Sequence, residues 1–558
     1  MRAVRERNFA NAPFLVGTLL LLCALTFYYF AVLRVDYSKT ALLDLDPRTD
    51  ATEYFAQAKA LLKDRSPSIQ IGYDKLPSRY AFGYPVLMLP WLKILPEADS
   101  ILAPFRTNQA LGLFLLLAVF VFYLYLAMPL TGGFAALLLA TLPGFFTFCR
   151  SSMSEISASL LIVFAFMFAY LGLAEECRWK IYFSAVLFGL SLNVRIQSLF
   201  FAPLLLAMAL FPARRMRLRW FLHCAAVPVL FLLAASPVLI LNAVEFHSPF
   251  KTGYNFWVPY WIENHLLFSL HYIPSNISML WKEFALRPDR FSVANIFGTG
   301  TSFVPAFIVL VCVGLFFIRV NRFVICAFLA GLSYLAVTAS YNYQLADGRF
   351  YLPLLILLVG VAVLPVIWAS KNLFVAKRII PPLVVSPEEM TIFILFAMAC
   401  LGYPSRSGYN ATKTDRFQAW DAIHFTTPPR QSVQFLAQRR FVKMFGRQAG
   451  IVLSDIDPVY LNALLPEAFV AAPVDGKHNF GLSEIWRYDR AQAAALAKRG
   501  LDQSLPVYAL FVSPEEMTAG QSRLPAIPGY RWTILNNSDP KAVILKLAPV
   551  ASEEPAPL

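Results

Sequence analysis

The chain has 558 residues, of which 58% are hydrophobic and 15% charged, and its mean hydropathy is +0.57. Soluble domains average about 45–50% apolar and about 25% charged residues, so this composition excludes a soluble globular enzyme, a disordered chain and a disulfide-stapled secreted domain. A multispan membrane protein with basic cytoplasmic loops explains the net charge of +14 better than a nucleic-acid-binding protein does. We therefore expect membrane lipids and no nucleic acid as partners.

Apolar runs of spanning or near-spanning length recur along the chain and predict a mainly α, polytopic protein with about eleven transmembrane helices. The first run is long enough to be a retained helix, and no cleavable signal peptide is evident. The runs are 14–33, 108–128, 133–149, 156–174, 181–196, 197–212, 220–243, 302–318, 323–340, 350–369 and 383–403. The two halves of 181–212 are short.

Lysine and arginine residues gather in alternate loops, and this asymmetry sets the orientation in the membrane. The basic segments are 2–7, 178–180, 214–219, 319–322 and 371–378. They predict a multi-pass protein of the inner (plasma) membrane with a cytoplasmic N-terminus and a periplasmic or extracytoplasmic C-terminal domain. A long first outer loop (34–107) and a second outer loop (244–301) then lie on the same side as the tail.

The tail, 404–558, is more polar and predicts a small α/β domain at the outer face, separate from a transmembrane domain over 1–403. The strand candidates are Gly450–Ser454, Phe469–Pro473, Val507–Val512, Tyr530–Leu535 and Ala542–Leu547, and Arg490–Arg499 is a helix candidate. The heptapeptide VSPEEMT occurs at 385–391 and 512–518. Each copy reads as a helix start with serine as N-cap.

The densest acidic cluster follows the first span, in DLDPRTDATEYFAQAKALL. It contains Asp44, Asp46, Asp50 and Glu53. Helical periodicity begins near Asp50, and the i, i+3 spacing puts Asp50 and Glu53 on one helix face. A paired acidic face at a membrane surface can act as a general base or bind a divalent cation such as Mg²⁺ or Mn²⁺. The alternative is helix capping beside a solvated face.

Other charged groups stand at the outer ends of the predicted spans, where charge is costly and hence of functional interest. Arg79, beside Tyr80 in SRYAFGYPVLMLPWL, can hold an anionic group or serve as an interfacial anchor. Glu155 opens the fourth span, as a dipole-complementing residue or a second acid. Arg195, within an apolar stretch, needs an anionic partner such as a lipid phosphate, or snorkels to the interface.

Two further segments of the outer side carry polar groups. Lys251 and Tyr254 stand in a dense aromatic run that suits an interfacial belt or a sugar-stacking platform. Asp347 and Arg349, in YNYQLADGRFYLPLL, either pair with each other or offer Arg349 as another phosphate ligand. The motifs HExxH, Walker A, GxGxxG and GxSxG are not convincing anywhere, and the six histidines show no metal spacing.

An ordered set of these segments resembles the GT-C glycosyltransferases, in particular the bacterial relatives of protein O-mannosyltransferases and lipid A aminoarabinose transferases. The resemblance covers roughly residues 14 to 403. Its motifs are D-x-x-x-Y (Asp50, Tyr54), SRYxxGYP (Arg79, Gly83, Pro85), SE (Ser154, Glu155), GLxxxxR (Gly189, Arg195), SPxxxxNxxxFxSPxxTGY (236–254) and GRFYLPLL (348–355).

The resemblance implies inverting transfer of a sugar from a polyprenyl-phosphate donor at the outer face. It implies Asp50 as the base that activates the acceptor, assistance from Glu155, and a donor phosphate held by Arg195 and Arg349, with Arg79 as a further candidate. Tyr54, Tyr80, Lys251 and Tyr254 are candidate substrate-binding residues. The sequence departs from the common adjacent acidic pair, because Ala51 follows Asp50 and Glu53 comes later.

The sequence thus predicts a membrane glycosyltransferase that moves a single sugar to a cell-envelope glycan, lipid or protein acceptor, with the glycan or lipid favoured. No cofactor is firmly expected, and the divalent cation remains open. A transporter or lipid flippase is the alternative, but it predicts charges deep within several spans. A scaffolding membrane protein would leave Arg195 and the outer acidic cluster without a purpose.

Overall fold

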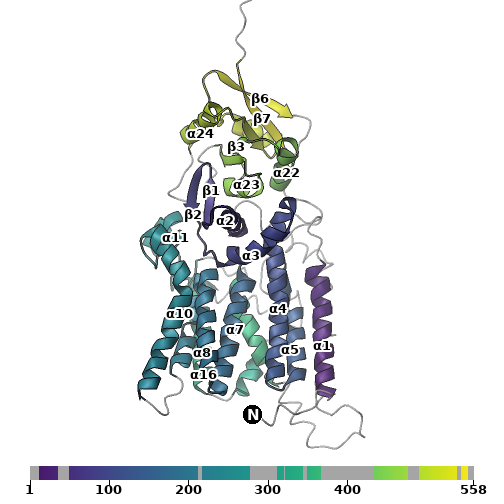
Figure 1. The fold of residues 1–558 in the computed structure, drawn as a ribbon, viewed down its shortest axis with the longest axis vertical. Helices are drawn as coiled ribbons and strands as arrows, with labels where there is room; N and C mark the ends of the chain where they lie inside the picture. Colours follow the sequence, from purple (N-terminus) through teal and green to yellow (C-terminus); the bar gives the residue numbers. More distant parts are fainter. Residues whose placement is uncertain are drawn as a thin grey trace, which may run out of the picture. The chain divides into compact units, whose positions relative to one another are not determined.

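The computed structural model describes residues 12–34, 50–210, 217–276, 311–318, 321–342, 348–365, 433–474, 489–536 and 542–550. The chain divides into two compact units (Figure 1). One unit comprises 1–36, 105–239 and 265–421, and the other comprises 37–104, 240–264 and 422–558. The second unit therefore joins the first outer loop, the start of the second outer loop and the tail. The predicted domain boundary at 403 lies outside the described residues.

The first unit is helical. Its elements, two of which run on into the second unit, are α1 (Ala12–Tyr28), η2 (Tyr29–Leu33), α4 (Ala103–Tyr125), α5 (Pro129–Thr141), α6 (Pro143–Cys149), α7 (Glu155–Ala174), α8 (Arg178–Val194), η5 (Ile196–Phe201), α9 (Pro203–Ala209), α10 (Arg217–Phe246), α16 (Arg322–Ala339), η6 (Gly348–Tyr351) and α17 (Leu352–Ala362).

Five helical segments among the described residues are long and apolar enough to cross a membrane. They are Phe14–Leu33, Asp99–Tyr125, Glu155–Ala174, Phe221–Phe246 and Arg322–Ala339, and they match five of the predicted spans. Two of them are largely exposed in the structure: only 17% of the window in α16 and 22% of that in α10 is buried, whereas α7 is 67% buried. A surface of this kind suits lipid, so the protein is a multi-pass membrane protein.

The predicted count of eleven spans is not confirmed. The run 133–149 is divided between α5 and α6 at Pro143, and 197–212 is divided between the 3₁₀-helix η5 and the short α9 at Pro203. Proline removes a backbone donor and clashes with the preceding turn, so an apolar run containing it need not be one helix. The runs 383–403 and most of 302–318 lie outside the described residues, as does the first VSPEEMT copy.

Helices α1 and α5 pack against each other (Figure 1) and approach to backbone distance at two glycines. A Cβ at Gly17 would meet the carbonyl oxygen of Pro129, and one at Gly133 would meet that of Gly17. Small residues let apolar helices approach to backbone distance and gain van der Waals contact where lipid offers no hydrophobic driving force. The two glycines therefore hold this helix pair together.

The second unit contains a helix, a hairpin and short helices from the outer loops. These are α2 (Asp50–Asp64), β1 (Ser68–Ile71), β2 (Asp74–Pro77), α3 (Gly83–Ile94), η4 (Glu97–Leu102), α11 (Gly253–Trp257) and α12 (Pro259–Glu263). The tail adds α22 (Val433–Phe445), β3 (Gly450–Ser454), α23 (Pro458–Leu464), β4 (Phe469–Pro473), α24 (Arg490–Asp502), β5 (Val507–Phe511), α25 (Pro514–Gln521), β6 (Tyr530–Asn536) and β7 (Val543–Pro549).

The tail strands form one five-stranded sheet in the order β4-β3-β5-β7-β6. Strands β4, β3 and β5 are parallel, whereas β7 runs antiparallel to both β5 and β6. All residues of β3 and β5 are buried, as expected for central strands covered on both faces. The five predicted strands and the predicted helix are confirmed, with ends that move by up to three residues.

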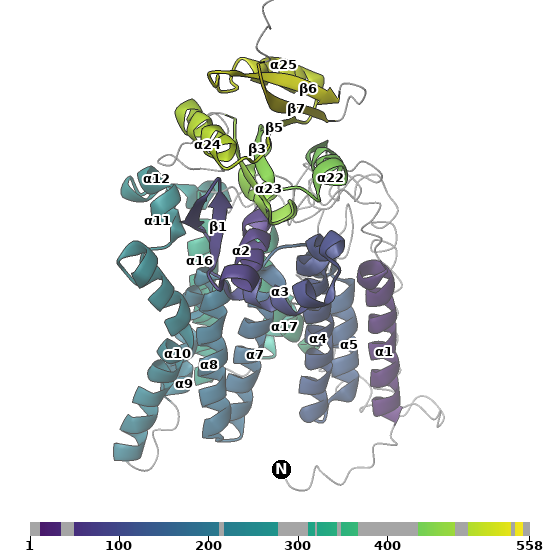
Figure 2. The same cartoon turned by 45° about the horizontal axis from the view of Figure 1, so that its top comes forward.

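The hairpin β1–β2 is attached to the edge of this sheet, beside α2 and α23 (Figure 2). The Asn462 amide nitrogen donates to the carbonyl oxygens of Gln70 at 3.0 Å and Ala471 at 2.8 Å, and the Gly72 N–H donates to that of Ala471 at 2.8 Å. These bonds satisfy polar backbone groups of the edge strand β4. They join the first outer loop to the tail across almost four hundred residues of sequence.

Gly133→Val should lower the thermal midpoint of the purified protein. The new side chain would have to displace the backbone at Gly17, and overpacking of this kind costs about 1–3 kcal/mol or more. Gly331→Ala is the control, because its Cβ would meet only the end of the flexible Leu354 side chain at 3.3 Å. Equal midpoints for wild type and Gly133→Val would contradict the close α1–α5 contact.

Asp457→Asn should stabilise the protein, increasingly so as the pH rises. Asp457 is buried and caps α23 by accepting from the N–H of Val459 at 2.8 Å and Tyr460 at 3.3 Å, and burial raises the pKa of its carboxyl to about 7. Folding therefore favours the protonated acid, and this contribution is lost as the pH rises from the ordinary pKa near 3.9 to about 7.

Asparagine caps a helix equally well and carries no charge. The thermal midpoints of the two proteins should agree near pH 4 and diverge up to about pH 7. The corresponding difference in the free energy of unfolding is at most about 4 kcal/mol, since one pKa unit corresponds to about 1.4 kcal/mol. A constant difference across this range would show that Asp457 does not titrate within it.

Candidate functional site

The first turn of α2 and the end of the hairpin meet in a buried ion pair. The Glu53 side chain is completely buried and the Arg79 side chain is 6% exposed, and one carboxylate oxygen of Glu53 pairs with the Arg79 guanidinium. The other oxygen accepts from the Ser78 hydroxyl at 2.8 Å and from the Arg79 N–H at 3.0 Å. Both carboxylate oxygens are thus held by residues that directly follow β2.

Asp50 lies one turn before Glu53, on the same face of α2, but its surroundings differ. It is only partly buried, and its carboxylate accepts a hydrogen bond from the Tyr80 hydroxyl. Burial raises the pKa of the Tyr80 phenol well above its ordinary value, against the lowering effect of the Arg79 charge. Tyr80 consequently keeps its proton and remains a donor that orients the Asp50 carboxylate.

Tyr80, the donor to this carboxylate, belongs to a cluster of tyrosine rings. The ring of Tyr80 lies 4.9 Å from that of Tyr54 and 5.9 Å from that of Tyr254 between centroids, and Tyr54 packs edge-on against Tyr84 at 5.3 Å. Edge-to-face contacts of this kind stabilise a fixed arrangement of rings. Tyr54 and Tyr84 are buried, whereas Tyr80 and Tyr254 are partly exposed.

A glycine lets α11 approach this surface. Any Cβ at Gly253 would collide with the carbonyl oxygen of Ser78, and the Trp257 indole N–H donates to the carbonyl oxygen of Pro77 at 2.7 Å. The TGY part of the predicted motif thus has a structural reason, since it places Tyr254 against Tyr80. Lys251 lies just before α11 and is exposed.

The Arg79 guanidinium stays charged. Burial by itself lowers the pKa of Arg79, but the neighbouring carboxylates and phenols, Glu53 foremost, raise it well above its ordinary range. An arginine bound to Glu53 in this way has fewer N–H groups to offer a ligand than a fully exposed one.

The described residues do not fit a divalent cation at this place. Glu53 is occupied by Arg79 and Ser78, and no group of three or more metal-ligating side chains occurs in the described part of the chain. Asp44 and Asp46, the other acids of the predicted cluster, lie outside the described residues.

A second ion pair lies in the first unit. Glu155, the first residue of α7, is 2% exposed, and one of its carboxylate oxygens pairs with the guanidinium of Arg195, which is 13% exposed. Arg195 follows the last residue of α8 in extended backbone, and its guanidinium stacks on the Phe350 ring at 5.7 Å. Phe350 belongs to η6, so the structure brings three of the predicted motifs together here.

Arg349 also belongs to η6, but its side chain and Asp347 lie outside the described residues. The structure therefore groups Asp50, Glu53, Tyr54, Arg79, Tyr80 and Tyr254 in the second unit and Glu155 with Arg195 in the first. Sequence reasoning missed Ser78, Gln57 and Asp457. Gln57 donates to the Ser78 hydroxyl at 2.7 Å, and its i, i+4 spacing from Glu53 was the available signal.

Comparison with known proteins bears on the fold. No protein-family model matches this chain, and no curated protein matches it. The oligosaccharyltransferase of Archaeoglobus fulgidus in its apo form has a TM-score of 0.51 at 12% identity, with 98% of this chain and 75% of that chain covered. Its complex with Zn and sulfate has a TM-score of 0.50 at 11% identity, with 96% and 73% covered.

ArnT from Cupriavidus metallidurans bound to undecaprenyl phosphate has a TM-score of 0.44 at 14% identity, with 95% of this chain and 97% of that chain covered. The likeness to the oligosaccharyltransferase, a GT-C protein, extends over almost the whole of this chain. The chain accordingly has the GT-C fold that the ordered motifs predicted, with a C-terminal sheet domain.

Proposed function

We propose that this protein is an integral membrane glycosyltransferase with a polyprenyl-phosphate sugar as donor and a cell-envelope glycan, lipid or protein as acceptor. The observation that carries the proposal is the contrast between the two carboxylates of α2. Glu53 is buried and fully bonded, whereas Asp50 is partly exposed and oriented by Tyr80 among aromatic rings. The GT-C fold supports the same class.

In this proposal Asp50 is the general base. Its carboxylate takes the proton of the acceptor hydroxyl while that oxygen attacks the anomeric carbon from the side opposite the phosphate. The bond between the anomeric carbon and the phosphate oxygen breaks, and polyprenyl phosphate leaves with the electron pair, so the configuration inverts. Glu53 and Arg79 position the first turn of α2 and Tyr80. The partly exposed rings of Tyr80 and Tyr254 bind the sugar by stacking, with Tyr54 packed behind Tyr80.

Arg195 and Arg349 are the proposed ligands of the donor phosphate. A guanidinium offers two parallel N–H groups to a phosphate and stabilises the charge that develops on the leaving group. Glu155 would hold Arg195 in place through their ion pair. The basic loops predicted as cytoplasmic support an orientation with the tail outside, in the inner (plasma) membrane.

Asp50→Asn should abolish transfer without loss of the fold. Removal of a general base lowers turnover by about 10²–10⁴-fold. The assay follows release of polyprenyl phosphate by the protein in lipid nanodiscs, with a panel of polyprenyl-phosphate sugars and cell-envelope extract. Full turnover by Asp50→Asn would remove Asp50 from the role of base.

Asp64→Asn is the matched control, because Asp64 is an aspartate of the same helix and pairs with the exposed Lys75 at 2.8 Å. Glu53→Gln distinguishes the proposed base, Asp50, from the proposed positioning residue, Glu53. It leaves Arg79 buried without its carboxylate and should cost about 3–5 kcal/mol of stability, seen as a lower thermal midpoint that Asp50→Asn does not share.

Arg195→Lys should weaken binding of undecaprenyl phosphate about tenfold, because the bidentate contact is lost while the charge opposite Glu155 is kept. The dissociation constant would be measured with nanodisc-embedded protein, with Arg178→Lys as control, since Arg178 is an exposed arginine at the other end of α8. An unchanged constant together with a lower thermal midpoint would make Arg195 a structural partner of Glu155 only.

A further inference from the structure

A concave surface of the second unit, lined mostly by cationic side chains among its charged groups, is separate from the Asp50 cluster. It has a volume of about 1340 Å³ and lies among α2, η4 and the stretch 435–448 at and after α22. Ordinary small-molecule pockets have about 300–1,000 Å³. This pocket is therefore large enough for an oligomeric ligand of several residues.

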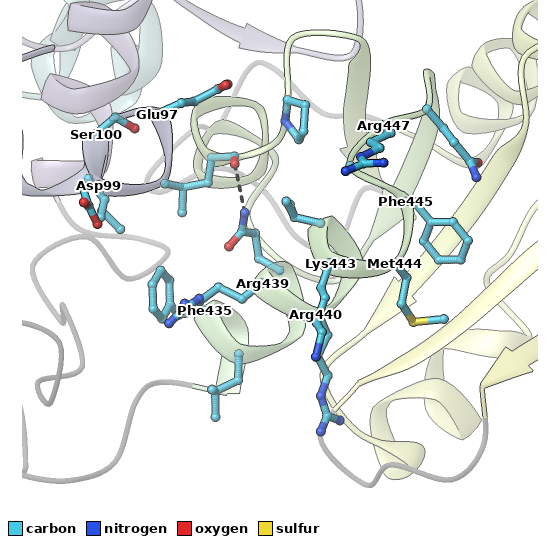
Figure 3. A pocket seen from close by; sticks show the side chains of 18 of the residues that line it. Glu97, Asp99, Ser100, Phe435, Arg439, Arg440, Lys443, Met444, Phe445 and Arg447 are labelled. Carbon is cyan, nitrogen blue, oxygen red and sulfur yellow. Dashed lines mark hydrogen bonds between the residues drawn. The ribbon is translucent and has the colours of Figure 1, made fainter. Parts of the chain in front are cut away.

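Five cationic side chains line the pocket. Lys59 comes from α2, and Arg439, Arg440, Lys443 and Arg447 come from α22 and the residues after it (Figure 3). The segment 433–448 contains no acidic residue. The lining carboxylates are Glu97 and Asp99 of η4, which Figure 3 shows on the other side of the pocket from Lys443 and Arg447.

The spacing of these cations works against the helix. Arg439 and Lys443 lie at i, i+4 within α22, where like charges destabilise a helix by a few tenths of a kcal/mol. Within the described residues neither Lys443 nor Arg447 forms an ion pair, and both are exposed. Burial and the nearby Lys63 charge also lower the pKa of Lys59, against Glu97 and Glu467. An anionic ligand would relieve this repulsion.

The rest of the lining suits a sugar chain. The partly exposed Phe435 offers a ring for stacking, and the exposed Gln448 offers its amide N–H groups, while its carbonyl oxygen accepts from the Tyr508 hydroxyl at 2.7 Å. A concave wall with aromatic and amide groups between its cations fits an extended saccharide better than the flat array of headgroups at a lipid surface.

We infer that this pocket binds an anionic glycan, a saccharide chain carrying carboxylate or phosphate groups, through the basic face of α22. In the context of the proposed transferase, on which this part of the inference rests, that glycan is the acceptor. Lys59 and Asp50 lie on the same helix, nine residues apart, which corresponds to ~14 Å along its axis. An acceptor chain of a few sugar units spans that length.

The test measures binding of a fluorescent octamer of galacturonic acid to the full chain in phosphatidylcholine nanodiscs. The wild type should bind it, more weakly as salt is raised, and should bind the neutral methyl ester of the same octamer at least about tenfold more weakly. Lys443→Glu with Arg447→Glu should weaken binding of the acidic octamer at least about tenfold.

Lys498→Glu with Lys546→Glu is the matched control, because it makes the same change of charge at exposed residues outside the pocket. Equal weakening by both double variants, equal affinity for the neutral octamer, or no binding by the wild type would overturn the inference. So would binding of phosphatidylglycerol vesicles through Lys443 and Arg447 without binding of the octamer, which would indicate a lipid surface. Failure of the transferase proposal alone would show as wild-type protein that binds the octamer but releases no polyprenyl phosphate from any donor.

Discussion

The buried ion pair between Glu53 and Arg79 is the constraint on which the second unit depends. A carboxylate with no exposed surface is tolerated only where its oxygens are bonded, because an uncompensated buried charge costs several kcal/mol. The chain meets this requirement by bringing the end of β2 against the first turn of α2. Gly253 then allows α11 to lie over the same place, and the Trp257 indole fastens it to Pro77. As a consequence Tyr80 reaches Asp50, and Tyr254 packs against Tyr80.

The first unit meets the same constraint among apolar helices. Glu155 and Arg195 are charged groups at helix ends in a chain that is otherwise hydrophobic, and each provides the counter-charge of the other. Each residue of this pair has irregular backbone next to it in the chain. The residues between α6 and α7 precede Glu155, and the 3₁₀-helix η5 follows Arg195. Such breaks expose backbone groups that need partners, so they occur where polar side chains gather.

Local patterns account for much of what could be predicted. The tail strands were recognisable because each is a short apolar run bounded by turn residues, and β3 and β4 end where the pattern ends. The start of α2 was recognisable from its acidic first turn and its periodicity. The continuity of the apolar runs was not, because length and hydropathy do not tell a spanning helix from two short ones divided at Pro143 or Pro203.

The sequence by itself determined the membrane class, the strands of the tail and the acidic face of α2, since these depend on composition and on spacings within a few residues. Only the tertiary structure decided how the two carboxylates of that face are bonded and buried. The i, i+3 spacing does not distinguish Asp50 from Glu53. In the folded chain Ser78 and Arg79, from the end of β2, donate to Glu53, and the Tyr80 hydroxyl donates to Asp50. The basic pocket likewise forms only in the tertiary structure. Its walls come from η4 and α22, which lie more than three hundred residues apart in the sequence. Contacts across such separations leave no periodic trace in the sequence, since each wall is an ordinary polar segment until folding places the two side by side.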